Sequence, residues 1–172
     1  DERVRRLRAS TKEQAEHIML VDLCRNDLSR VARPRSLAVD GLMVVETFSH
    51  VFHLVSTVSA GLDATADVWD TLRATFPAGT MTGAPKLRAM EIIQGIEEQP
   101  RGAYAGAAGL VDVRGWSELA LCIRTVVSDG QGYSTQSSAG IVALSDPEQE
   151  WAETMAKMAP AYWALTGEEL LR

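Results

Sequence analysis

Two pairs of glutamates carry the clearest chemical signal in the sequence. Glu13 and Glu16 lie near the start of the chain, and Glu150 and Glu153 lie near its end. Residues three positions apart share one face of an α-helix, so each pair presents two carboxylates together. Mg²⁺ prefers carboxylate oxygens and keeps waters and anionic substrate oxygens in its shell. The pattern therefore allows a magnesium site between two acidic helix faces, although spacing alone favours two solvated faces, with Glu153 paired to Lys157.

A single arginine lies in an apolar context. Arg124 belongs to LALCIRTVV, within a strand predicted over 119–128, and its neighbours on the same face are apolar. Burying an unpaired guanidinium is costly, so we expect a carboxylate partner from the protein or from a substrate. A structural ion pair and a substrate clamp remain equally open. His53, within VFHLV, is more typical of a core histidine than of a catalyst.

Two turns could bind an anion through backbone N–H groups. GTMTGAPK lacks the Gly-Lys-Ser/Thr succession of a nucleotide-binding loop, because Ala84 and Pro85 intervene. Thr80 in this segment nevertheless precedes a predicted helix N-terminus, which is a favourable place for negative charge. The run Ser138-Ala139-Gly140 could likewise offer donors to a carboxylate, or it could be a plain turn.

The composition is that of a folded domain with an acidic balance. The 172 residues include 23 acidic and 17 basic side chains, which leaves a net charge of −6, so we expect no nucleic-acid partner. No apolar run approaches the roughly 20 residues of a membrane span, and the charged start DERVRRLR is unlike a signal peptide. Two distant cysteines without a CxxC motif favour a reducing compartment, and we expect the cytoplasm. Because helix-forming residues begin at position 1 without a methionine, we expect a portion of a longer protein.

The elements that must position these residues alternate between helices and strands. Helical periodicity and caps predict helices over 11–28, 67–76 and 86–94. A last helix is predicted to begin at a Ser145–Glu148 capping box and to be stopped or kinked at Pro160. Branched and aromatic residues predict strands over 39–59, 103–113, 119–128 and 133–143. We therefore predict one domain that mixes helices and strands.

Long strings of the sequence resemble one family. They are AEHIMLVDLCRNDLSRV, FSHVFHLVSTV, FPAGTMTGAPKLRAMEII, RGAYAGAAG, CIRT and SSAGIVALSDPEQEWAET. Together they resemble the C-terminal part of the chorismate-utilising synthases, namely anthranilate synthase component I and aminodeoxychorismate synthase component I. The resemblance implies an α+β fold in which antiparallel sheets are layered with helices, with residues 1–172 forming the C-terminal part of one chorismate-binding catalytic domain.

The resemblance also implies an activity and a metal. The family aminates chorismate in a Mg²⁺-dependent reaction, with ammonia supplied by a glutamine amidotransferase subunit or fused domain. On that pattern Glu16 and Glu153 bind magnesium directly, and Glu13 and Glu150 lie nearby or act through water. The ion neutralises the ring carboxylate and helps the hydroxyl depart. The family's general acid and the residue that governs nucleophile delivery are expected upstream of Asp1.

Further roles follow from the same resemblance. Arg124 and Tyr104 hold the enolpyruvyl carboxylate, helped by backbone N–H groups of the turn Ser138-Ala139-Gly140. Three other residues complete the implied site: Lys157 adds positive charge, Thr80 lines the ring pocket, and His53 lines it and assists the departing group. Ser138 stands where the family usually has glycine, and its side chain could crowd the substrate carboxylate or donate to it.

Several members of the family remain possible. AEH, SHVFH, FPAGT and SSAGIV resemble anthranilate synthases, whereas HLVST and MTGAPK resemble aminodeoxychorismate synthases, so the sequence slightly favours anthranilate. Isochorismate or salicylate synthases use water as the nucleophile, and Ala84 argues against the salicylate type. A non-catalytic chorismate-family domain is the last alternative. Retention of all four glutamates argues against it, because a decayed site has no physical reason to keep acidic residues facing one another.

Overall fold

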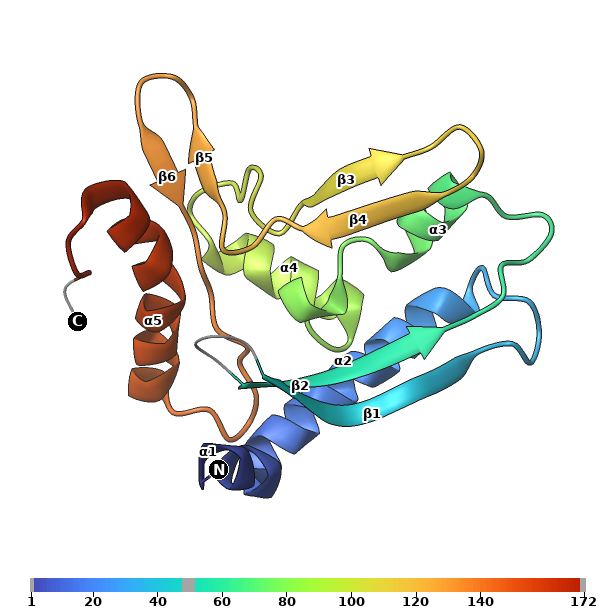
Figure 1. Ribbon diagram of the computed structural model, residues 1–172, viewed down its shortest axis with the longest axis horizontal. Helices are drawn as coiled ribbons and strands as arrows, with labels where there is room; N and C mark the ends of the chain where they lie inside the picture. The colour runs from blue at the N-terminus through green and yellow to red at the C-terminus, as the bar shows by residue number, and fades with distance from the viewer. Residues whose placement is uncertain (1, 48–51, 171–172) are drawn as a thin grey trace. The chain divides into compact units, whose positions relative to one another are not determined.

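The computed structural model describes residues 2–47 and 52–170 (Figure 1). The contacts between residues divide the chain into two compact units. The first unit comprises Asp1–Ile93 and Val113–Trp116, and the second comprises Gln94–Asp112 and Ser117–Arg172. The division falls inside helix α4, near its C-terminal end. Each unit is described by itself below.

The first unit begins with two helices and a β-hairpin. α1 (Glu2–Ala9) precedes α2 (Thr11–Ser29), and β1 (Ala38–Thr47) pairs antiparallel with β2 (Phe52–Ser59). The Ser10 hydroxyl caps α2 by accepting a hydrogen bond from the Glu13 N–H at 3.3 Å. The helix predicted over 11–28 and the strands predicted within 39–59 are confirmed, while positions 48–51 lie outside the described residues.

The remaining elements of this unit follow the hairpin. α3 (Val68–Thr75) starts at a capping box formed by Asp67 and Asp70. The helix predicted over 67–76 is therefore confirmed. A short 3₁₀ turn, η1 (Gly79–Met81), leads to α4 (Lys86–Ile96). The helix predicted over 86–94 is confirmed and extends two residues further, through Gly95 to Ile96.

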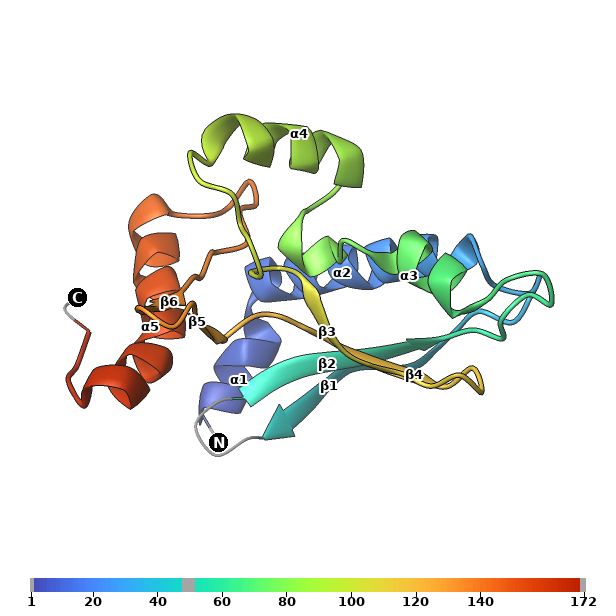
Figure 2. The same cartoon turned by 90° about the horizontal axis from the view of Figure 1, so that it is seen from above.

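Helix α2 is the element around which the first unit packs. It contacts β2, α3 and η1, and Figure 2 shows it running alongside α3. Val21 of α2 and Ala74 of α3 are buried. Gly79 lets η1 approach closely, because a Cβ there would stand 2.8 Å from Leu23 Cδ1 and 2.9 Å from Leu23 Cβ. The loop that carries Thr80 is therefore held against the helix that carries Glu13 and Glu16.

The second unit contains two small hairpins and the last helix. β3 (Ala107–Val111) pairs antiparallel with β4 (Ser117–Leu121), and β5 (Val126–Ser128) pairs antiparallel with β6 (Tyr133–Thr135). Gly109 is required where β3 meets β4, because a side chain there would collide with the Glu118 carbonyl. α5 (Pro147–Thr166) follows and contacts β6.

Arg124 interrupts what the sequence suggested was one strand. The strand predicted over 119–128 is wrong, because the chain leaves β4 at Leu121 and resumes pairing only at Val126. Arg124 adopts a left-handed conformation, with φ of 52°, and is exposed. Because Arg124 is exposed, its guanidinium does not bear the cost of burial among apolar side chains that the predicted strand implied.

Four further boundaries differ from expectation. The strands predicted over 103–113 and 133–143 shorten to β3 and β6. The N-cap of α5 is Asp146, whose side chain accepts from the Gln149 N–H, whereas Ser145 accepts from the Val142 N–H instead. The helix also continues through Pro160 and ends at Gly167, whose φ of 72° provides a left-handed cap.

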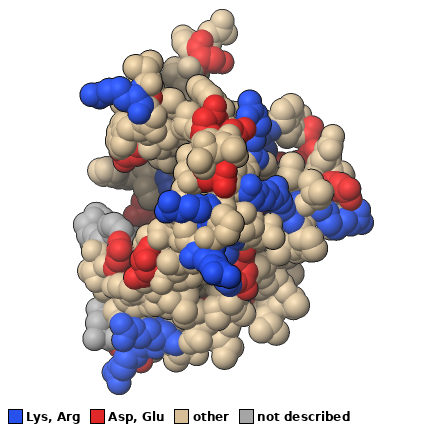
Figure 3. All heavy atoms as spheres, turned by 90° about the vertical axis from the view of Figure 1, so that its right-hand side faces the viewer, with Lys and Arg blue, Asp and Glu red and all other residues tan. Residues whose placement is uncertain are grey.

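The elements are those of an α+β chain with antiparallel pairing, as predicted. Across the described ranges, each helix is too short or too polar to cross a membrane. The face shown in Figure 3 has Lys and Arg side chains intermixed with Asp and Glu.

Candidate functional site

An acidic pocket lies in the first unit. It has a volume of about 160 Å³ and is lined by residues of α1, α2 and β2, namely Leu7, Glu13, Glu16, His17, Leu20, Phe52, His53 and Leu54. Three side chains with predicted roles, Glu13, Glu16 and His53, thus share one pocket. His53 is exposed, so the interpretation of a core histidine is wrong. The reason is strand alternation, which turns Phe52 and Leu54 toward the more covered face and His53 away from it.

His17 belongs to the same pocket and lies on the helical face of Glu13 and Glu16, although the family resemblance implied no role for it. Its Nε2 lies 2.6 Å from the Ser56 hydroxyl, which also accepts a hydrogen bond from the Met43 N–H at 2.9 Å. Partial burial lowers the pKa of the His17 imidazole. The available signal was its position four residues after Glu13, on the same helical face.

A hydrogen-bonded cluster lies in the second unit. The Tyr104 hydroxyl is 2.6 Å from the Ser138 hydroxyl, and Lys157 Nζ donates to the Ser138 carbonyl at 3.2 Å. Lys157 also forms an ion pair of 2.5 Å with Glu153. The fold therefore brings together Tyr104, Ser138, Lys157 and Glu153, each of which has a predicted role.

Arg101 supports the Tyr104 ring and was missed in the sequence. Its guanidinium carbon lies 5.7 Å from the ring centroid, in a cation–π arrangement. Arg101 is also bonded to Glu97 at 2.6 Å, and this contact holds the pKa of the Glu97 carboxyl below its usual range. The same part of the second unit contains a pocket of about 350 Å³, which Arg101 and Tyr104 line together with Cys122 and Gln136.

The two acidic helix pairs fall in different units. Glu150 is buried on α5, and Glu153 lies one helical turn further on. The donor chemistry fits Mg²⁺, since all four side chains offer hard carboxylate oxygens. Within the described residues, no group of three or more His, Cys, Asp or Glu side chains is placed to hold an ion. Each unit by itself supplies one pair of carboxylates.

The other predicted residues occupy irregular segments. Exposed Thr80 belongs to η1, and exposed Arg124 lies between β4 and β5. Ala139 and Gly140 are partly buried in the segment between β6 and α5. Backbone hydrogen bonds between Cys122 and the neighbours of Tyr104 continue the β3–β4 pairing toward Arg124.

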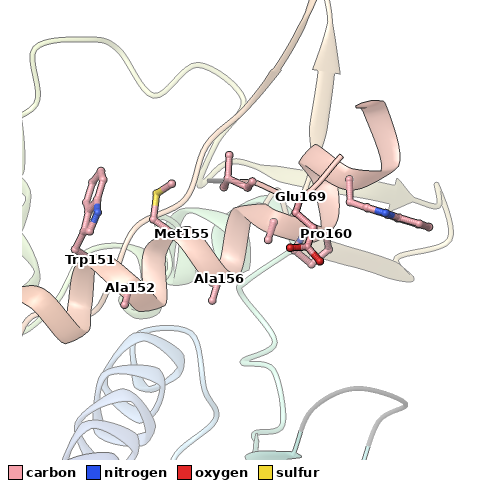
Figure 4. Close-up of a pocket in the computed structure, with 9 residues that line it drawn as sticks. Trp151, Ala152, Met155, Ala156, Pro160 and Glu169 are labelled. Carbon is pink, nitrogen blue, oxygen red and sulfur yellow. The ribbon is translucent and has the colours of Figure 1, made fainter. Parts of the chain in front are cut away.

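A larger groove runs along α5 and differs in chemistry. It has a volume of about 640 Å³, and its lining is mainly apolar, including Trp151, Met155, Pro160 and Trp163, with Glu169 at its side. Figure 4 shows Trp151 and Met155 extending from the same side of the helix. Its lining lacks the paired carboxylates of the acidic pocket.

A buried ion pair connects α2 to the start of α4. Lys86 Nζ lies 2.6 Å from Asp27 Oδ2, and both side chains are largely removed from solvent. Sequence analysis missed it, because the partners are 59 residues apart. The contact anchors the segment that follows Thr80 to the helix that bears Glu13 and Glu16.

Comparison with known proteins identifies the family. Residues 1–162 match the profile of the chorismate binding enzymes. The chain is 60% identical over 96% of its length to 2-amino-4-deoxychorismate synthase of Streptomyces globisporus, and 54% identical over 89% of its length to anthranilate synthase component 1 of Streptomyces coelicolor. It spans 34% and 30% of those two proteins, about a third of the length of the curated relatives that it matches.

A solved structure agrees with this match. Anthranilate synthase component I from Streptococcus pneumoniae superposes with a TM-score of 0.85 and 44% identity, covering 90% of this chain and 36% of that one. The chain therefore belongs to the chorismate binding enzyme family. The predicted resemblance and the predicted α+β chorismate-binding fold are both confirmed.

Proposed function

We propose that the chain forms the C-terminal part of the catalytic domain of a magnesium-dependent enzyme that aminates chorismate. The family match over residues 1–162 carries the proposal, because it spans both acidic helices, Tyr104 and Arg124. Ammonia forms a C–N bond to the ring and the hydroxyl leaves as water. A glutamine amidotransferase, as a separate subunit or a fused domain, supplies the ammonia.

The four glutamates are the proposed metal ligands. Glu16 and Glu153 bind the ion directly, whereas Glu13 and Glu150 act nearby or through water. A bound magnesium ion supplies charge neutralisation for the ring carboxylate and for the departing hydroxyl. The pairing of Glu153 with Lys157 keeps a cation beside one of these carboxylates.

The remaining polar residues bind and orient the substrate in this proposal. Arg124 and Tyr104 donate hydrogen bonds to the enolpyruvyl carboxylate, and backbone N–H groups near Gly140 add further donors. Thr80 lines the ring pocket. His53 shares its pocket with Glu16, and its imidazole assists the departing hydroxyl through a hydrogen bond.

Two products are candidates. Anthranilate is the first, supported by the AEH, FPAGT and SSAGIV strings. The second is an aminodeoxychorismate: the HLVST and MTGAPK strings support the 4-amino-4-deoxy isomer, and the 60% identity to a 2-amino-4-deoxychorismate synthase supports the 2-amino isomer. Anthranilate formation removes the side chain as pyruvate, whereas the second product keeps the chorismate skeleton, so pyruvate release distinguishes them.

The test uses the full-length protein that contains this chain. We expect chorismate with Mg²⁺ to raise its melting temperature, and ammonium salts to support turnover of chorismate. A lactate dehydrogenase assay then measures pyruvate. Glu16→Gln and Glu153→Gln should each remove the thermal shift. Each should also lower turnover more than roughly 10–100-fold, which is the usual cost of losing a residue that only supports a metal ligand. Glu168→Gln, on an exposed position after α5, is the matched control.

A wild-type protein that shows neither a thermal shift nor turnover would contradict the proposal. That outcome would favour a non-catalytic chorismate-family domain.

A further inference from the structure

Ser138 links two parts of the second unit that carry proposed functions. Its hydroxyl contacts the Tyr104 hydroxyl at 2.6 Å, and its carbonyl accepts from Lys157 on α5. The first contact joins residues 34 positions apart, so it exists only in the folded chain. Both contacts involve one residue of the irregular segment between β6 and α5.

The direction of the hydroxyl contact has a chemical consequence. Each hydroxyl can donate one hydrogen bond and accept two. A carboxylate only accepts, so a substrate carboxylate can use Tyr104 only if the tyrosine donates its hydrogen to it. Ser138 must then donate to the Tyr104 oxygen. Hydrogen bonds arranged in such a series strengthen one another.

The rest of the cluster leaves Tyr104 little freedom. Arg101 lies over the ring, and Glu97 holds Arg101. Ser138 meets the other end of the side chain, and it is itself held through Lys157 and the Glu153 carboxylate. The tyrosine hydroxyl is therefore fixed at a position set by α5.

We propose that Ser138 is a positioning residue: its side chain orients the Tyr104 hydroxyl toward the substrate carboxylate and couples that hydroxyl to the Glu153 face of α5. The inference rests on the function proposed above. It assigns Ser138 a role through the tyrosine, in addition to any contact of its backbone with substrate.

The test is a double-mutant cycle in the full-length enzyme, with kcat and the KM for chorismate as readouts. Ser138→Ala should raise KM about 2- to 10-fold, the usual range for one hydrogen bond, and should change kcat less than about 2-fold. Tyr104→Phe should raise KM at least as much. The double variant should be no worse than Tyr104→Phe alone, because the serine acts through the tyrosine. Ser138→Thr keeps the hydroxyl and should recover most of the loss, and exposed Ser128→Ala, on β5 of the same unit, is the matched control.

Multiplicative effects in the double variant would overturn the inference, as would an unchanged KM in Ser138→Ala. A loss of kcat with unchanged KM would indicate a folding defect and would also overturn it. If the wild type is active and the two substitutions act independently, only the positioning role of Ser138 is rejected. If the wild type is inactive, both the proposed function and the positioning role are rejected.

Discussion

For single residues, the contact between Asp27 and Lys86 is an ion pair of the first unit that is largely removed from solvent. The Asp27 side chain is 5% exposed and the Lys86 side chain 12% exposed. Charges removed from water need a partner, so each side chain depends on the other. The pair also attaches the start of α4 to α2, and so bears on the position of the Thr80 loop.

We expect Lys86→Met to lower the free energy of unfolding by about 3–5 kcal/mol, because it leaves the Asp27 carboxylate buried without its counter-ion. Urea denaturation followed by circular dichroism measures this change. Replacing both residues, as Asp27→Leu with Lys86→Met, should recover much of the loss.

The control for this prediction is an exposed ion pair. Arg25 and Asp22 are 2.8 Å apart, but their side chains are 50% and 61% exposed. Arg25→Met should therefore change stability by no more than about 0.5 kcal/mol. Equal effects of Lys86→Met and Arg25→Met would show that the Asp27 pair is not buried.

At the scale of elements, the placement of η1 on α2 depends on a glycine. Gly79 lies where any side chain would press on Leu23, including its Cβ, which cannot rotate away. Gly95 of α4 offers the opposite case, because nothing outside its own helix lies within 4 Å of a Cβ placed there. The two glycines form a matched pair for the same substitution.

Gly79→Ala should destabilise the protein by about 1–3 kcal/mol, because the added methyl group forces η1 away from α2. Gly95→Ala should stabilise it by about 0.5–1 kcal/mol, since alanine is the better helix former. Urea denaturation compares the two variants. Adding Leu23→Ala to Gly79→Ala should cost less than the sum of the single changes, and a purely additive result would reject the close contact.

At the scale of the whole molecule, large apolar side chains remain at the surface. Among the described residues, the buried hydrophobic side chains are Val21, Ala74 and Ala105. All four tryptophans of the sequence are more than half exposed, with values of 51% for Trp69, 54% for Trp116, 65% for Trp151 and 62% for Trp163. Two of them line the groove on α5.

We therefore expect acrylamide to quench the tryptophan fluorescence of this 172-residue chain completely, with a linear Stern–Volmer plot. The same titration of the urea-unfolded chain is the reference for full accessibility. In the folded chain, no fraction of the tryptophan emission should be protected from acrylamide. A protected fraction equivalent to one of the four tryptophans would contradict the exposure seen here.

Local sequence patterns predicted the features that depend on near neighbours. Helical periodicity located α2 and α3, and the three-residue spacing placed Glu13 beside Glu16 and Glu150 beside Glu153 on their helices. The long family strings also indicated the chorismate binding enzymes, which the family match confirmed. Backbone hydrogen bonds and side-chain faces repeat within four residues, so such features can be predicted from local patterns.

Contacts between distant residues could not be predicted in this way and became visible in the folded chain. The left-handed turn at Arg124 broke a predicted strand, and His53 proved exposed beside Glu16 and His17. The contact of Tyr104 with Ser138 and that of Asp27 with Lys86 join positions 34 and 59 residues apart. Such contacts depend on how whole elements pack against one another. The number of residues between two positions does not predict this packing, because the two side chains meet only in the folded chain.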